Sequence, residues 1–126
     1  MSPVPAPGML HIETMPLNDS DPRIATFTTS LLVGFIEGAC LAALRPYLAP
    51  GVTSGVRLEL SQISAKPLGA KVTAIVRLIA VEGRKLTFRV DCRDEHDVIA
   101  HAVHERVTRN ILAARARRDE AIDNAA

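Results

Sequence analysis

The distribution of apolar residues predicts one buried helix in the first half of the chain. Residues 31–44, LLVGFIEGACLAAL, are apolar or small except for Glu37. Apolar residues recur there at the spacing of one helix face, namely Leu32, Phe35, Ile36, Ala39 and Ala43. Pro46 disfavours a helical conformation at Arg45. We therefore expect a helix over residues 30–45.

Strand-like patterns lie on both sides of this helix. Residues 9–15 alternate between apolar and polar positions, and four later segments alternate or are rich in β-branched residues. These later segments are 54–65, 70–81, 84–94 and 98–111. The dipeptide Glu82-Gly83 is typical of a tight turn between two of them. One helix facing such an antiparallel sheet is an α+β two-layer arrangement.

The same pattern divides the chain into one folded unit and two flanking segments. We expect a single domain over residues 9–111, a flexible tail at 1–8, and a polar C-terminal tail or short helix at 112–126. Residues 16–30 contain two prolines and several turn formers, which predict an irregular loop. Because one helix covers only one side of a sheet, the near-continuous apolar pattern of residues 72–81 favours burial against a second copy of the chain.

Composition narrows the classes of function. The chain has 126 residues, 48% of them hydrophobic, which is enough to bury a core. A net charge of +1 and an aromatic content of 3% argue against a nucleic-acid partner. The N-terminal segment lacks the pattern of a signal peptide, and no apolar run is long enough for a membrane span. Cys40 and Cys92 are interpreted as two reduced thiols, so we expect a cytoplasmic protein without a membrane partner. The Cys, His and Asp spacings predict no metal site.

Glu37 is the exceptional residue of the predicted helix. A buried carboxylate without a partner costs several kcal/mol. Two interpretations stay open: a solvated residue on the outer helix face or at a subunit contact, or a general base or nucleophile beside an apolar pocket. Thr29, at the expected helix entrance, either caps the helix or faces the same pocket.

Five motifs follow one another along the chain: TSLLVGFIEGAC, RPYLAPG, KPLG, VEGRKL and HER. Together they resemble the fluoroacetyl-CoA thioesterase-like family of hotdog-fold proteins, over roughly residues 25–110. The resemblance implies a hotdog fold, in which an antiparallel sheet wraps around one central helix. It also implies a homodimer that hydrolyses an acyl thioester at a site on the subunit interface.

The resemblance assigns roles to five residues. The family's catalytic pattern is a Thr, a Glu on the central helix and a His on the following strand. The Thr matches Thr29 and the Glu matches Glu37, but Gln62 occupies the position of the His. Gly55 matches a glycine close to the bound thioester, and Arg106 of the HER motif matches an arginine that helps form the substrate site. Unlike His, a Gln side chain cannot titrate and only forms hydrogen bonds.

A mechanism in which Glu37 is the base or nucleophile does not require the family's histidine, so it is compatible with Gln62 at that position. We expect hydrolysis of an acyl thioester on CoA or on an acyl-carrier protein, with Thr29 and Gln62 orienting the reacting groups. CoA then belongs to the substrate, and no separate cofactor is implied. Segment 16–28 is shorter and more polar than the lid of the family's name-giving member, so fluoroacetyl-CoA itself is not the expected substrate. A thioester-binding protein without hydrolysis, or another reaction such as cyclisation or elimination, stays open as an alternative.

Two histidines lie on the last predicted strand. His101 and His104 are three residues apart, so their side chains are expected on opposite faces of the sheet. His104, part of the HER motif, is expected to pack or hydrogen-bond at the sheet. His101 replaces the missing family histidine only if its strand presents it to the pocket.

Overall fold

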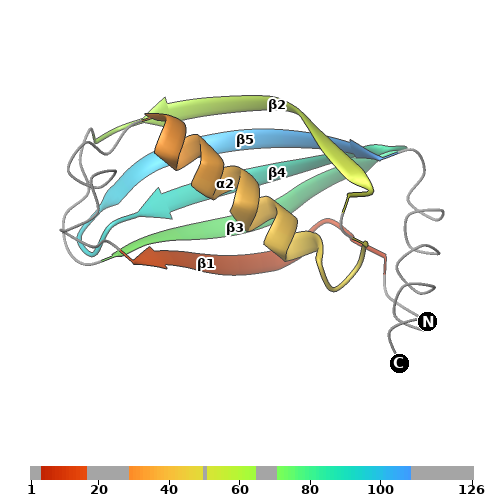
Figure 1. Cartoon of the computed structure of the whole chain (residues 1–126), viewed down its shortest axis with the longest axis horizontal. Helices are drawn as coiled ribbons and strands as arrows, with labels where there is room; N and C mark the ends of the chain where they lie inside the picture. The colour runs from red at the N-terminus through yellow and green to blue at the C-terminus, as the bar shows by residue number, and fades with distance from the viewer. Residues whose placement is uncertain (1–3, 17–28, 50, 65–70, 109–126) are drawn as a thin grey trace.

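The computed structural model describes residues 4–16, 29–49, 51–64 and 71–108, which form one helix lying across a five-stranded antiparallel sheet (Figure 1). Helix α2 spans Thr29–Leu44. The strands are β1 (Leu10–Pro16), β2 (Thr53–Gln62), β3 (Lys71–Glu82), β4 (Lys85–Arg93) and β5 (Val98–Thr108). The predicted helix and all five predicted strands are confirmed, with ends that differ from the predicted ones by a few residues.

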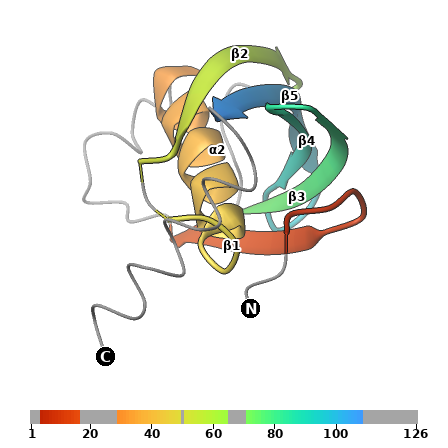
Figure 2. The ribbon, with the colours of Figure 1, turned by 90° about the vertical axis from the view of Figure 1, so that its right-hand side faces the viewer.

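The strand order in the sheet is β1-β3-β4-β5-β2, and every neighbouring pair is antiparallel. Strands β3, β4 and β5 follow one another as a meander, while β1 and β2 form the two edges. Figure 2 shows the sheet curling around α2. In Figure 1 the helix crosses the sheet diagonally, beginning near the end of β2 and ending near β1. This arrangement confirms the predicted α+β fold with a sheet wrapped around one helix.

The core lies between α2 and the inner face of the sheet. Alternate residues of β3 and β4 point toward the helix because successive side chains of a strand face opposite sides. The buried inner residues of these strands are Val72, Ala74, Val76, Leu78, Leu86, Phe88, Val90 and Cys92. On the outer face of β3, Arg77 and Ile79 are exposed. Among the described residues, therefore, nothing covers the outer face at these two positions.

The β3–β4 connection is the tight turn that the Glu82-Gly83 dipeptide predicts. Two residues, Gly83 and Arg84, join the strands. Gly83 has a φ of 61°, a left-handed conformation that glycine adopts without steric cost. The short turn fixes the register in which β4 pairs with β3.

Cys40 and Cys92 are free and buried, as the reduced-thiol prediction requires. Burial raises the pKa of both thiols to about 12. Both side chains are therefore neutral thiols near pH 7, and a neutral thiol is a poor nucleophile. These two residues belong to the core and not to the chemistry.

Three predicted segments fall wholly or partly outside the described residues. The C-terminal tail 112–126 lies outside them, as does most of the predicted loop 16–30. The N-terminal tail 1–8 is described from residue 4, and the backbone N–H of Gly8 donates to the carbonyl oxygen of Leu78 at 2.9 Å. Within the described ranges, no helix has the length and apolar character needed to cross a membrane.

Candidate active site

Thr29 and Gln62 meet where the first turn of α2 passes the end of β2. The Thr29 hydroxyl donates a hydrogen bond to Oε1 of Gln62 at 2.9 Å. The Gln62 amide nitrogen donates to the carbonyl oxygen of Ser64 at 3.0 Å, which fixes the orientation of the amide. Because its proton points at Gln62, the Thr29 oxygen is left with lone pairs that can accept a hydrogen bond from water.

Glu37 lies about two turns farther along α2 and is half-buried. Among the residues that the structure describes, no side-chain hydrogen bond or ion pair engages its carboxylate. Burial lowers the pKa values of Arg106 and His104, and the negative charge of Glu37 opposes both changes, so the carboxylate lies within electrostatic range of these two residues. An unengaged, half-buried carboxylate is free to bind a water molecule or a substrate group.

Arg106 is a buried guanidinium on the inner face of β5, and only 4% of its surface is exposed. Its Nε donates to the hydroxyl oxygen of Thr53 and its Nη2 donates to the Thr53 carbonyl oxygen, both at 3.0 Å. Burial lowers the pKa of Arg106, and the nearby Glu37 carboxylate opposes this effect. The site therefore contains a fixed positive charge close to the carboxylate of Glu37.

Gly55 is the cross-strand neighbour of Arg106. A β-carbon at this position would lie 3.0 Å from Cε1 of His104 and 3.1 Å from Nη1 of Arg106. The absence of a side chain therefore lets these two inner residues of β5 pack directly against the β2 backbone. Register also shifts between Gly55 and Arg57, which is typical of a β-bulge next to a functional site.

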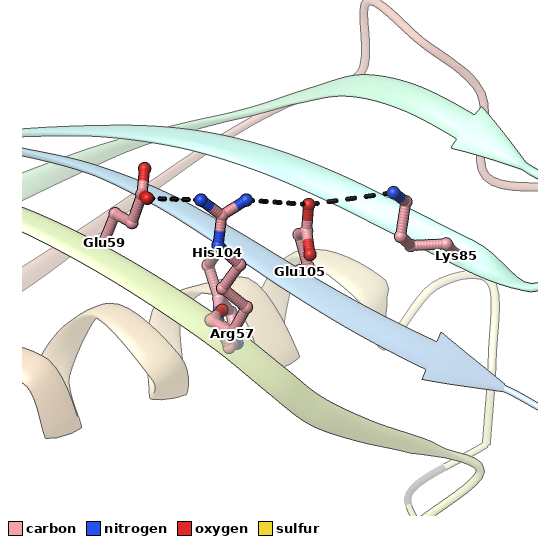
Figure 3. Close-up of polar contacts among 5 residues, drawn as sticks. All are labelled: Arg57, Glu59, Lys85, His104 and Glu105. Atoms are coloured by element: carbon pink, nitrogen blue, oxygen red, sulfur yellow. Dashed lines mark hydrogen bonds and ion pairs between the residues drawn. The ribbon is translucent and has the colours of Figure 1, made fainter.

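The outer face of the same strands carries a separate set of charges. Figure 3 shows the Arg57 guanidinium extended between Glu59 and Glu105, and Glu105 also approaches Lys85. His101 is exposed on this face and lies 2.6 Å from the carboxylate of Asp91. His101 and His104 thus lie on opposite faces of the sheet, as their spacing predicts, and His101 faces away from the helix.

The structure arranges the five predicted site residues in two groups. Thr29 and Gln62 are in contact at the start of α2, while Gly55 and Arg106 pack together beside Glu37. Thr29 and Glu37 are eight positions apart in the helix, a rise of about 12 Å. Within one chain, therefore, the predicted catalytic Thr and Glu lie on different turns of α2.

Two members of the site were not predicted from the sequence. Thr53 holds Arg106 with two hydrogen bonds, and His104 contacts Arg106 through its ring nitrogen at 3.3 Å. The HER motif could have indicated the His104 contact, because residues two apart on a strand share a face. No local sequence pattern indicates the contact of Thr53 with Arg106, since that contact depends on the pairing of β2 with β5.

Three hollows on the described surface have volumes of about 560, 400 and 190 Å³. None of these three is lined by Thr29, Glu37 or Gln62. A search of the described residues also finds no group of His, Cys, Asp and Glu that could hold a metal ion.

Comparison with known proteins agrees with this architecture. The family model described as "Fluoroacetyl-CoA-specific thioesterase" matches residues 13–110. The fluoroacetyl-CoA thioesterase of Streptantibioticus cattleyicolor is 42% identical over 81 residues, which are 64% of this chain. The match spans 58% of that relative's length.

Solved structures show the same fold. A mutant of the fluoroacetyl-CoA-specific thioesterase FlK, in complex with fluoroacetate and CoA, superposes with a TM-score of 0.68 and 30% identity. The superposition covers 86% of this chain and 98% of that one. A thioesterase superfamily member from Thermus thermophilus, 22% identical, shares the fold over all of both chains with a TM-score of 0.70. On the evidence of the family match over residues 13–110, the chain belongs to the fluoroacetyl-CoA-specific thioesterase family.

Proposed function

We propose that this protein hydrolyses acyl-CoA thioesters, with Glu37 as the catalytic carboxylate. The observation that carries the proposal is the half-buried Glu37 carboxylate, which no described side chain engages and which faces the buried charge of Arg106. Membership of a thioesterase family supports the reaction class. The CoA bound in the FlK complex supports CoA as the carrier, with an acyl-carrier protein as the other candidate. Two free buried thiols fit a cytoplasmic location.

The reaction needs one water molecule and one proton acceptor. In the proposed mechanism Glu37 takes a proton from water as the water oxygen forms a bond to the thioester carbon. The carbon–sulfur bond then breaks and the sulfur takes the proton that Glu37 held. CoA leaves as the free thiol, the water oxygen stays on the acyl carbon as part of the acid product, and Glu37 is again a carboxylate. Thr29 and Gln62 would orient the water or the carbonyl. A backbone N–H near Gly55 or at the helix start would stabilise the negative charge on the carbonyl oxygen.

A homodimer would unite the two separated groups of site residues. With about 12 Å of helix between them, Thr29 and Glu37 reach a common substrate if one protomer supplies Thr29 and Gln62 and its partner supplies Glu37. Strand β2 is suited to the contact, because it is a ten-residue edge strand. An edge strand presents free backbone groups that pair readily with another strand. Val56 and Ile63, 56% and 62% exposed, lie on or just after it.

We therefore expect a sedimentation-equilibrium mass of twice 13.6 kDa for the wild type. Val56→Lys should weaken the dimer and lower activity in parallel, since a charge at a sheet edge opposes pairing. Ile12→Lys is the matched control, because Ile12 is 58% exposed on the opposite edge strand β1. A wild type that is monomeric and fully active would contradict the shared site.

Gln62 provides the observation that favours a second candidate, a thioester-binding protein without hydrolysis. Its amide is committed to Thr29 and to Ser64, and it cannot act as a base. In the hydrolase, Gln62→Leu should lower kcat about tenfold, since a hydrogen bond at the site is lost. In the binding protein, the wild type should release no thiol, and Gln62→His should start release. If wild type, Gln62→Leu and Gln62→His release thiol at the same rate, Gln62 does not belong to the site.

A further inference from the structure

His104 is an enclosed histidine whose two ring nitrogens have different partners. Only 2% of its surface is exposed. Its Nδ1 lies 2.8 Å from the Arg57 carbonyl oxygen, which only accepts, so Nδ1 carries a proton. Its Nε2 lies 3.3 Å from Nη1 of Arg106, which only donates, so Nε2 is unprotonated. These contacts define a neutral imidazole with a fixed tautomer.

This ring completes the support of the Arg106 side chain. Thr53 accepts hydrogen bonds from Nε and Nη2 of the guanidinium, and His104 accepts the one from Nη1. A guanidinium has five N–H groups, so these three bonds leave two N–H groups for a carboxylate or a carbonyl oxygen. The three bonds together fix the direction in which those two N–H groups point.

The His104–Arg106 pair lies directly beneath Gly55, the position matched to the family's thioester site. A side chain there would contact Cε1 of His104 and Nη1 of Arg106 together. On the helix side, the charge of Glu37 opposes the lowering of both pKa values that burial causes, so Glu37 lies within electrostatic range of the pair. A substrate group held between Gly55 and Glu37 would therefore approach the guanidinium that His104 supports.

We propose that His104 is a positioning residue for thioester hydrolysis: its neutral ring holds the Arg106 guanidinium beside Glu37, and its protonation releases that guanidinium and lowers turnover. The proposal rests on the proposed function for its kinetic consequence. The structural part of the proposal, in which the protonation of His104 is coupled to Arg106, can be tested in the protein without substrate.

The groups around His104 favour the neutral ring. Burial lowers its pKa from the ordinary 6.5, and the positive charge of Arg106 lowers it further. The hydrogen bond to the β2 carbonyl of Arg57 and the charge of Glu37 on α2 oppose this change. Cys40 on α2 is a neutral thiol, and the cross-strand neighbours Leu58 and Phe88 are apolar.

The direction in which pH changes the stability of the fold follows from the lowered pKa of His104. As the pH falls below 6.5, the unfolded chain takes up the proton at residue 104 before the folded chain does. The neutral His104 ring makes its full contribution to the free energy of unfolding above pH 6.5. This contribution is lost as the pH falls toward the pKa of His104 in the folded chain. Protonation of the folded ring then sets an N–H at Nε2 against the N–H of Arg106, which breaks their hydrogen bond.

The first test uses nitrogen NMR of the full chain without substrate. We expect His104 to be protonated at Nδ1 near pH 8 and to titrate below 6.5, and the Arg106 Nε–H signal to shift with the same midpoint. In His104→Gln, whose amide oxygen can still accept from Arg106, this shift should be absent. A proton on Nε2 near pH 8, or an Arg106 signal that ignores the His104 titration, would overturn the proposal even if the protein hydrolyses acyl-CoA.

The second test is the pH dependence of kcat for acyl-CoA hydrolysis. In wild type kcat should fall as His104 is protonated. His104→Gln should keep a similar kcat at pH 8 and show its acid limb at lower pH, because the reaction still needs an unprotonated carboxylate as the base. His104→Phe should lower kcat about tenfold at pH 8, since a hydrogen bond to a charged donor is lost. His101→Gln, on the outer face of the same strand, is the control and should match wild type.

The outcomes separate the two proposals. An acid limb that persists unchanged in His104→Gln would overturn the role of His104. If His104→Phe does not fold, the wild type and His104→Gln still decide the question through the NMR and kinetic comparisons. If no acyl-CoA is hydrolysed, the proposed function fails, while the NMR titration still tests the coupling of His104 to Arg106.

Discussion

Glu37→Gln abolishes thioester hydrolysis in our account and leaves the fold intact. The amide has nearly the shape of the carboxylate but can neither take a proton from water nor attack the thioester carbon. Loss of a general base typically lowers kcat by about 10²–10⁴-fold, and we expect a loss of about 10³-fold here. Because no described side chain forms a hydrogen bond or close ion pair with Glu37, the substitution breaks no such contact among the described residues. Thiol release, the unfolding midpoint and acyl-CoA affinity should be measured together.

Glu82→Gln is the matched control for this substitution. Glu82 is an exposed carboxylate at the end of β3, next to the β3–β4 turn. It should keep the wild-type kcat, so that a loss confined to Glu37→Gln reports the chemistry of that one carboxylate. If Glu37→Gln turns over as fast as wild type, Glu37 is a structural residue and the proposed mechanism is wrong.

Arg106→Met is the second substitution with a large expected effect, and it acts on stability and activity together. It removes three hydrogen bonds and leaves the Thr53 carbonyl, the Thr53 hydroxyl and the His104 ring without their donor. A buried group left unpaired costs about 1–3 kcal/mol. His104 is buried, but Thr53 is only half-buried and water can replace part of what it loses, so we expect a total loss of about 2–4 kcal/mol in the free energy of unfolding. Since the positive charge beside Glu37 also disappears, kcat should fall by at least about tenfold. Urea unfolding and thiol release measure the two effects.

One further variant separates charge from geometry at this position, and a second variant elsewhere is its control. Arg106→Lys keeps the positive charge but cannot form the three bonds of the planar guanidinium. It should retain part of the activity and less of the stability. Arg77→Met, on the exposed outer face of β3, is the control and should change neither quantity. An Arg106→Met variant as stable and active as wild type would show that the buried guanidinium has no role in the site.

The secondary structure was predictable from the sequence because local patterns determine it. The alternation in β3 and β4, the Glu82-Gly83 turn and the stop at Pro46 each depend on a few neighbouring residues. The sheet order was not predictable in this way. Strand β2 lies at the edge beside β5 rather than next to β3, which follows it in the chain. That placement depends on packing around α2 and not on any local pattern.

The candidate site was predictable only in part, for the same reason. Glu37 and Thr29 were singled out from the helix pattern, and Gln62, Gly55 and Arg106 were identified through a resemblance. The structure adds which of the five touch. The contact of Thr29 with Gln62 depends on where the helix start meets the end of β2. The support of Arg106 by Thr53 depends on the register of β2 against β5. Neither of these two contacts is encoded within one segment, so sequence patterns did not reveal them.

Release of free CoA thiol by the wild-type protein is the most direct test of the central claim. The substrates should be a panel of short, branched and aromatic acyl-CoAs, with acyl-CoA affinity measured on the same samples. We expect saturable thiol release from at least one of them by the wild type, and none above background by Glu37→Gln. Binding of acyl-CoA without release from any member of the panel would contradict hydrolysis and identify a thioester-binding protein instead.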